Sequence, residues 1–429
     1  MTDGAGTQQP ERRVRLAGRA VFVVFALNGG VFASWVSRLP AVREQLDLTP
    51  GEMGLVLLVG AAGALVALPL TGLLVDRVGS ANATRIAAAT CAAGLIAAAV
   101  AVGAGSTPRV AVSSFAAAMG VGAWDVAMNI QGGVVEHRFG RAMMPRFHAG
   151  FSLGAVGGAG AGVLAASTGF SVTAQVTATS ALAAVAVMLI VGAYLPDDGG
   201  APASPQSVGE AESGANAFSA WSERRTVLLG LVVLAAALTE GGANDWLAIA
   251  VVDVFGTSEA VGAIAFGAFV TAMTAMRLIG TRLLDRYGRV VVLRVSAGFA
   301  LVGLAVFGLA PGLLVAMAGA MVWGLGTALG FPVGMSAASD DPARAAARVS
   351  VVASIGYIAF LAGPPVLGLL ADHLGYRPAL MVIAGPLVVG LVLASAAQPE
   401  SSAQAVADAP AAPAQPAEAS QVRALSLIH

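Results

Sequence analysis

The feature that most constrains this chain is a series of twelve long apolar segments, each long enough to cross a lipid bilayer. A helix needs about 20 apolar residues to span a hydrocarbon core of about 30 Å. The runs are continuous and show no period-2 alternation, so they predict helices rather than the strands of a membrane barrel. We therefore expect an all-α membrane protein with twelve transmembrane helices, at residues 17–37, 53–75, 84–103, 110–133, 148–168, 172–195, 226–247, 260–283, 289–310, 313–337, 350–371 and 378–397.

The composition agrees with this expectation. Hydrophobic residues make up 57% of the chain and charged residues 11%, with a mean hydropathy of +0.81, whereas soluble domains carry about 25% charged residues. The 54 glycines and the low aromatic share of 6% suit helices that approach closely in lipid. A large aromatic-rich soluble core is excluded.

Several kinds of chemistry are excluded by missing residue types. All 23 basic residues are arginine, so no lysine is present to hold a nucleotide phosphate or to form a Schiff base. The single cysteine, Cys91, and four scattered histidines offer neither a disulfide framework nor a metal-ligand cluster. We expect a chain that is not an enzyme, with no catalytic residues, no cofactor, no metal and no nucleic-acid partner.

The arginines are distributed unevenly between the two sides of the predicted membrane. If the N-terminus is cytoplasmic, eighteen arginines lie in inside segments, and the outside loops hold only Arg38, Arg43, Arg109 and Arg377. This asymmetry follows the positive-inside rule, and the N-terminus shows no cleavable signal. We expect a multi-pass protein of the cytoplasmic membrane, in contact with lipid, with both termini cytoplasmic.

One polar stretch divides the spans into two sets of six. Residues 197–221 are rich in Gly, Pro, Ser and Ala, which is typical of a flexible linker. The predicted organisation is a cytoplasmic N-terminal arm (1–16), an N-terminal six-helix bundle (17–196), a cytoplasmic linker (197–221), a C-terminal six-helix bundle (222–398) and a disordered C-terminal tail (399–429).

The two halves also repeat a short motif. The segment Gly-L-L-V-Asp-Arg-V-Gly at 72–79 matches Asp-Arg-Y-Gly-Arg at 285–289, with the aspartates 209 positions apart. Gly30 and Trp35 likewise match Gly241 and Trp246 at an offset of 211. A repeat of six plus six spans is the build of a secondary transporter.

On this loop motif the chain resembles the major facilitator superfamily over about residues 15–398. The segments 128–136, 146–154 and 240–246 are similar to a bacterial branch grouped with sugar-permease-like and efflux proteins. Ser80 and Ala81 stand where the superfamily usually has basic residues. Phe115 and Ala116 occupy the region where drug/proton exchangers carry an arginine, and span 5 lacks their Gly-Pro, so the resemblance does not extend to an ordinary drug antiporter.

The repeated motif predicts a conformational latch at the cytoplasmic ends of the halves. An aspartate there can accept backbone N–H groups at a helix start and pair with arginine across the helix gap. The alternative is a solvated cluster of loop charges. The expected latch residues are Gly72, Asp76, Arg77, Gly79, Asp285, Arg286, Gly288 and Arg289.

Polar residues inside the spans are the candidates for a substrate and proton pathway, because such residues are unfavourable in lipid unless paired or wetted. They are Asp125, Asn129, Glu240, Asn244, Arg277, Asn28, Trp124 and His148. Asp125/Asn129 and Glu240/Asn244 share a spacing of four that places each pair on one helix face.

Several of these residues have a structural alternative. Asp125 could be a partner of Arg277, Asn28 a helix–helix hydrogen bond, His148 a cap and Trp124 a lipid anchor. Glu240 has no arginine within a turn of its own sequence. Asp245 follows at the membrane interface.

A second expected feature is a seam between the halves. Glycines recur every four residues at 150, 154, 158 and 162 and predict a smooth ridge on span 5. The superfamily's architecture implies that this ridge meets span 8 at Gly262 and Gly267.

Together these features predict a monomeric secondary active transporter that moves a small organic solute by alternating access. Coupling to protons through Asp125 and Glu240 is expected, with symport of a sugar-like solute favoured. The alternatives are efflux of a drug-like compound or secondary metabolite and, from another class, a non-transporting membrane sensor on a transporter scaffold.

Overall fold

The chain folds into helices throughout the part that the structure describes, which comprises residues 4–140, 143–197, 219–341 and 344–399 of a computed structural model. The first half contains α1 (Gly4–Val36), α2 (Leu39–Gln45), α3 (Pro50–Gly103), α4 (Thr107–Phe139), α5 (Met144–Ser167), α6 (Val172–Ile190) and η1 (Val191–Ala193). The second half contains α8 (Arg224–Phe255), α9 (Glu259–Leu309), α10 (Leu313–Thr327), α11 (Gly330–Ala338), α12 (Ala345–Leu374), α13 (Tyr376–Met381), α14 (Ala384–Leu393) and η3 (Ala394–Ala397). Most of the predicted linker and nearly all of the predicted tail lie outside the described residues.

Two of the helices are double passes. The described residues contain ten helices long and apolar enough to span a membrane, of which α3 has 54 residues and α9 has 51. Each is interrupted by one glycine of non-helical conformation, Gly79 (φ 78°, ψ 158°) in α3 and Gly288 (φ 74°, ψ 164°) in α9. These angles suit glycine because a side chain would clash there.

Contacts with α4 show that α3 folds back at Gly79. Gly63 and Gly94, on either side of the kink, lie against Phe115 and Ala117 of α4, which are neighbours on one helix. In a straight helix the two glycines would be about 46 Å apart. α9 folds back at Gly288 in the same way. Phe269 and Gly303, on either side of that kink, lie against Gly324 and Trp323, which are adjacent residues of α10. The fold therefore has the twelve passes that the sequence predicts.

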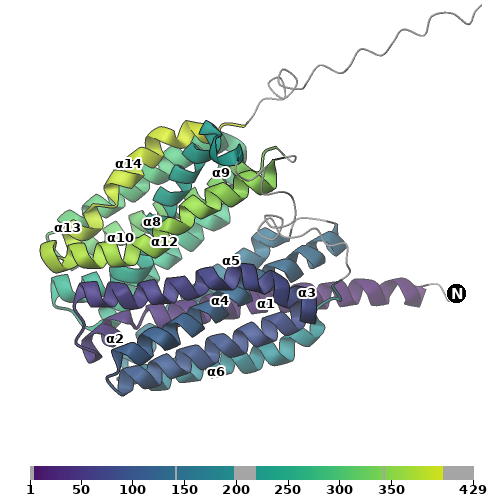
Figure 1. Cartoon of the computed structure of the whole chain (residues 1–429), viewed down its shortest axis with the longest axis horizontal. Coiled ribbons are helices and arrows are strands. Elements are labelled where there is room, and N and C mark those ends of the chain that lie inside the picture. Colours follow the sequence, from purple (N-terminus) through teal and green to yellow (C-terminus); the bar gives the residue numbers. More distant parts are fainter. Residues whose placement is uncertain (1–3, 141–142, 198–218, 342–343, 400–429) are drawn as a thin grey trace, which may run out of the picture. The chain divides into compact units, whose positions relative to one another are not determined.

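The passes give the molecule two ends. We call the end where α1 begins and η1 leads to residue 197 the linker end, and the end that carries α2 and α13 the far end (Figure 1). A capping box starts α3 at the far end, because Thr49 accepts a hydrogen bond from the Glu52 backbone and donates its own N–H to the Glu52 side chain. Gly79 and Gly288 lie at the linker end.

The glycine ridge of α5 packs within the first half rather than between the halves. A Cβ at Gly154 or Gly158 would collide with a backbone carbonyl of α1, and one at Gly150 would lie 2.9 Å from the Phe22 carbonyl oxygen. The predicted seam with span 8, which is the first pass of α9, is therefore wrong for this ridge. The ridge instead lets α1 and α5 approach closely. Contact with α9 occurs on another face of α5, where Gly267 lies beside Ala159.

Candidate functional site

A cavity of about 500 Å³ lies between the two halves. Helices α1 to α5 line it from the first half, and α8 and α12 line it from the second. Its volume falls within the range of about 300–1,000 Å³ that is typical of small-molecule sites. Apolar side chains form most of the wall, and a few polar groups interrupt it.

Asp125 of α4 brings a carboxylate to this wall. Its neighbour Asn129, one turn later, donates to the Asp125 carbonyl at 2.8 Å and to Oδ1 at 3.3 Å. The predicted pair therefore interacts on one helix face, although Asn129 does not line the cavity. No ion pair to Asp125 is found in the described part of the chain.

Glu240 of α8 is paired with Arg277 of α9. Arg277 Nη2 donates to Glu240 Oε1 at 3.0 Å and to Oε2 at 3.1 Å, and its Nε donates to the Ala328 carbonyl at 3.3 Å. The sequence has no arginine within a turn of Glu240, but packing of α9 on α8 brings in one from 37 positions away. The alternative that Arg277 pairs with Asp125 is not observed.

The structure separates the remaining predicted pathway residues into two groups. Asn28 and Asn244 line the cavity. Trp124 is 1% exposed and belongs to the packed core. It is adjacent to Asp125 in the sequence, and adjacent residues of a helix point about 100° apart, so the two side chains point in different directions. His148 is exposed and stacks edge-on against Phe25 at 5.2 Å between ring centroids, and it is not among the lining residues.

Sequence reasoning missed other polar members of the wall. Asp245, read as interfacial, lines the cavity beside Asn244. Tyr357 of α12 and Ser114 of α4 also line it. Asp245 continues the polar run of span 7 and was recognisable in principle, whereas a tyrosine or serine in an apolar span carries no signal of its own.

Polar contacts join the two halves at the far end. Arg38, at the start of α2, forms an ion pair with Glu259 of α9 and donates to the Phe170 carbonyl at 3.0 Å. Arg43 pairs with Asp253 of α8 at 2.6 Å. Beside them, Gly54 of α3 approaches the Pro364 carbonyl of α12 so closely that a Cβ would lie 2.7 Å from the oxygen. These contacts hold the two halves together at the far end of the cavity.

The predicted latch residues lie at the linker end. In the part of the chain that the structure describes, they form no bridge between the halves. Asp76, Arg77, Asp285 and Arg286 are exposed. Arg289 instead pairs with Asp340 of its own half at 2.5 Å, and Gly72 has open space around it.

A second linker-end network ties α8 to α12. Glu223 accepts hydrogen bonds from Thr226 at 3.0 Å and from Arg348 at 2.7 Å, and pairs with Arg344 at 3.1 Å. Burial raises the pKa of Glu223, but these hydrogen bonds and arginine charges outweigh it and hold the pKa below its ordinary value of 4.5. Glu223 lies just before the first span of the second half, and the network stays within that half.

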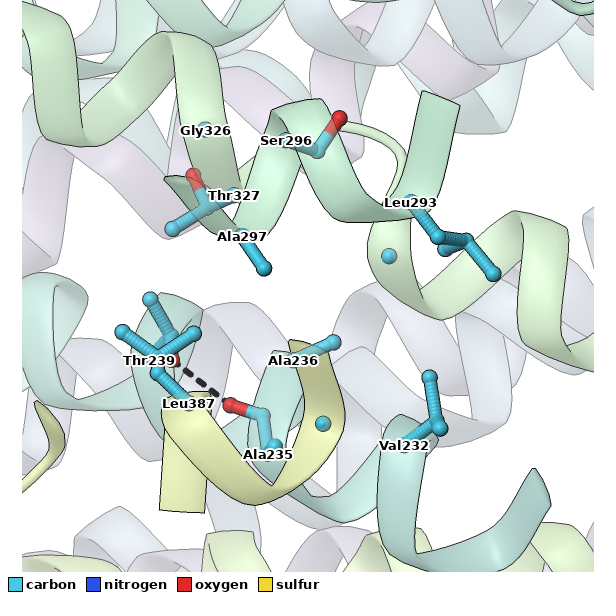
Figure 2. Close-up of a pocket in the computed structure, with 12 residues that line it drawn as sticks. Val232, Ala235, Ala236, Thr239, Leu293, Ser296, Ala297, Gly326, Thr327 and Leu387 are labelled. Carbon is cyan, nitrogen blue, oxygen red and sulfur yellow. Dashed lines mark hydrogen bonds between the residues drawn. The ribbon is translucent and has the colours of Figure 1, made fainter. Parts of the chain in front are cut away.

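A smaller cavity of about 30 Å³ lies inside the second half (Figure 2). Ser296, Thr327 and Thr239 line it from three helices, and the Thr239 hydroxyl donates to the Ala235 carbonyl at 2.6 Å. A space of this size holds about one water molecule. It is too small for an organic solute, so the cavity between the halves is the candidate site.

The comparisons with known proteins give the class of this chain. The sequence profile described as Major Facilitator Superfamily matches residues 20–349 and 229–428. The transporter y4wD of Sinorhizobium fredii (strain NBRC 101917 / NGR234) is 33% identical over 373 residues, which cover 87% of this chain and 96% of that protein. An MFS-type transporter of Yersinia pestis is 29% identical over 372 residues, covering 85% and 90%.

Solved structures agree on the fold. The crystal structure of the nucleoside transporter NupG gives a TM-score of 0.71 at 16% identity, covering 90% of this chain and 100% of that one. The chain belongs to the major facilitator superfamily. It is a multi-pass membrane protein of the transporter type, and its relatives are transporters rather than enzymes. The family and the all-α fold predicted from the sequence are confirmed.

Proposed function

We propose that this chain is a secondary active transporter that moves a small organic solute by alternating access through the cavity between its halves. The observation that supports this most is the cavity itself, which is lined by both halves and tied shut at the far end by Arg38–Glu259 and Arg43–Asp253. Contacts of this kind can form in one state and break in another, which is what exposure to alternate sides requires.

The linker end is proposed to face the cytoplasm, with the protein in the cytoplasmic membrane as a monomer. The arginine asymmetry of the sequence supports this orientation. With that orientation the structure represents a state closed to the outside. The latch then belongs to the opposite state, in which Asp76 or Asp285 pairs with arginines across the linker end.

Coupling to protons is proposed to run through Asp125. Ionisable groups inside a membrane protein that lack a fixed counter-charge are those at which protons load and leave. Among the described residues Asp125 and Asp245 meet this condition, whereas Glu240 is held by two hydrogen bonds from Arg277. Of the two aspartates, Asp125 is the one for which the sequence already predicts a proton role. Glu240 and Arg277 therefore take a supporting role, as a pair that fixes α8 against α9 beside the cavity.

Reconstituted transport tests this proposal. Purified protein in proteoliposomes would be given a panel of monosaccharides, nucleosides and organic amines, with and without a pH gradient. Nucleosides are included because the fold neighbour NupG is a nucleoside transporter. We expect at least one solute to accumulate when the gradient is imposed and to stop accumulating when a protonophore removes it.

The variant Asp125→Asn separates transport from coupling. It should exchange solute across the membrane but lose accumulation driven by the pH gradient, since an amide cannot carry the proton. Asp47→Asn is the matched control, because Asp47 is exposed in a far-end loop with φ 50°, a conformation that asparagine tolerates. Gradient-driven accumulation in Asp125→Asn at the wild-type level would exclude Asp125 as the coupling site. Binding without transport by the wild-type protein would favour a sensor.

A further inference from the structure

The charge of the cavity wall is unbalanced. Three carboxylates line it, Asp125 from the first half and Glu240 and Asp245 from the second. Arg277 neutralises Glu240. Among the described residues, the Asp125 carboxylate has no ion pair and accepts a hydrogen bond from the side-chain amide of Asn129, and Asp245 has neither an ion pair nor a hydrogen bond from another side chain. One carboxylate from each half is thus left facing the cavity without a cation.

A buried amide beside these carboxylates is also unsatisfied. Asn28 of α1 is 1% exposed and lines the same cavity, and neither its side-chain nitrogen nor its oxygen has a hydrogen-bond partner. Buried polar groups are nearly always paired, so an unpaired amide facing a cavity indicates a place for a ligand or water. Asn28 can both donate to and accept from such a ligand.

The rest of the wall indicates what kind of molecule fits. Aromatic side chains line the cavity from both halves, and aliphatic side chains fill the spaces between them: Phe32, Trp35, Phe151, Tyr357 and Phe360. A sugar would leave several hydroxyl groups against apolar surface, where each loses its hydrogen bonds. An anion would be repelled by the carboxylates. An apolar body with a positive charge satisfies the wall, because aromatic faces also attract cations.

We propose that the cavity binds an organic cation, an amine or quaternary ammonium with an apolar or aromatic body, whose charge is held by Asp125 and Asp245 and whose polar substituent pairs with Asn28. This deepens the proposed function by naming its substrate class and rests on that function only for the step of transport. It departs from the sugar-like solute that the sequence favours.

Equilibrium binding tests the assignment without requiring transport. The probe is ethidium, a permanent aromatic cation, added to the purified full chain and followed by its fluorescence. The matched neutral probe is the phenanthridine that ethidium becomes when its N-ethyl group is removed, 3,8-diamino-6-phenylphenanthridine, which keeps the rings and amino groups without the fixed charge. Glucose represents neutral polyols. We expect saturable binding of ethidium, and binding of the other two that is at least about tenfold weaker.

A pH titration of ethidium binding tests the proposal on the wild-type protein, so the result does not depend on whether a variant folds. Protons compete with a cation for carboxylates. Ethidium affinity should fall as the pH is lowered and protons occupy the carboxylates, whereas any phenanthridine binding in the range where it is uncharged should not. Asp125→Asn and Asp245→Asn should each weaken ethidium at least about tenfold, with Asp47→Asn as the unchanged control. Absence of saturable ethidium binding, or equal affinity for phenanthridine with no pH dependence, would overturn the proposal.

The two proposals fail in different ways. Ethidium binding that depends on both aspartates, in a protein that transports no solute, supports the cation site and contradicts the transport function. Gradient-driven transport of a neutral solute by a protein that does not bind ethidium does the reverse.

Discussion

Breaking the ion pair between Arg38 and Glu259 should open the far end of the molecule. The variant Glu259→Gln removes the negative charge and leaves the Arg38 guanidinium with the Phe170 carbonyl as its remaining described acceptor. The pair joins α9 to the start of α2, so it exists only while the halves are together at this end. Its loss therefore destabilises the closed state and leaves the open state, in which both groups are hydrated, almost unchanged.

The size of the effect follows from the burial of the pair. The Arg38 side chain is 3% exposed and that of Glu259 is 21% exposed, so water screens the interaction only in part. Hydrogen bonds to charged groups contribute about 1.5–3 kcal/mol. With about 2 kcal/mol assigned to this pair, the ratio of closed to open far ends falls about thirtyfold.

Cysteine accessibility measures this ratio. Cys91 is replaced by alanine, and a single cysteine is placed at Val42, which is buried and lines the cavity at the far end. A membrane-impermeant maleimide, applied on the side of the membrane that the far end faces, should label this cysteine about thirtyfold faster in Glu259→Gln than in the otherwise unchanged protein. Glu44→Gln, an exposed acid on α2, controls for charge removal at this end. Equal labelling of the wild type and Glu259→Gln would show that this ion pair does not hold the far end closed.

Three further predictions concern stability, each measured by thermal unfolding of the purified protein. Gly154→Ala should lower the free energy of unfolding by about 1–3 kcal/mol because its Cβ would strike a carbonyl of α1, whereas Gly157→Ala, in open space, should not. Gly288→Ala should lower it by about 1–3 kcal/mol, since φ 74° and ψ 164° suit glycine alone. Glu223→Gln should lower the free energy of unfolding at neutral pH. This difference from the wild type should shrink as the pH falls below 4.5, because the wild-type carboxylate then becomes protonated. The pKa of Glu223 is low because its hydrogen bonds and the arginine charges outweigh burial. A deficit that stays constant down to pH 3 would contradict this last prediction.

The spans could be predicted from the sequence because their signal is local. Twelve apolar runs give twelve passes, and the two motif copies mark the turns at Gly79 and Gly288 that divide α3 and α9 into two passes each. Which helices touch is a different matter. The α5 ridge is visible as glycines every four residues, but the sequence does not say which helix fills it, and the structure places α1 there.

The site shows the same division. Asn28, Asp125, Glu240 and Asn244 were recognisable because polar residues are rare in apolar spans, and all four line the cavity. The partner of Glu240 was not, since Arg277 reaches it through packing of separate helices. The polar contacts at the far end escaped prediction for that reason too: charges in loops are ordinary until the fold brings them together.

If the two halves rock about the cavity, distances between them change in opposite directions at the two ends, and pairs of spin labels measure both distances. Spin labels at Gln45 and Ser258 report on the far end, and labels at Asn82 and Arg282 report on the linker end; all four residues are exposed. In membranes we expect Glu259→Gln to lengthen the far-end distance and to shorten the linker-end distance. Distances that stay fixed, or that change in the same direction at both ends, would contradict alternating access.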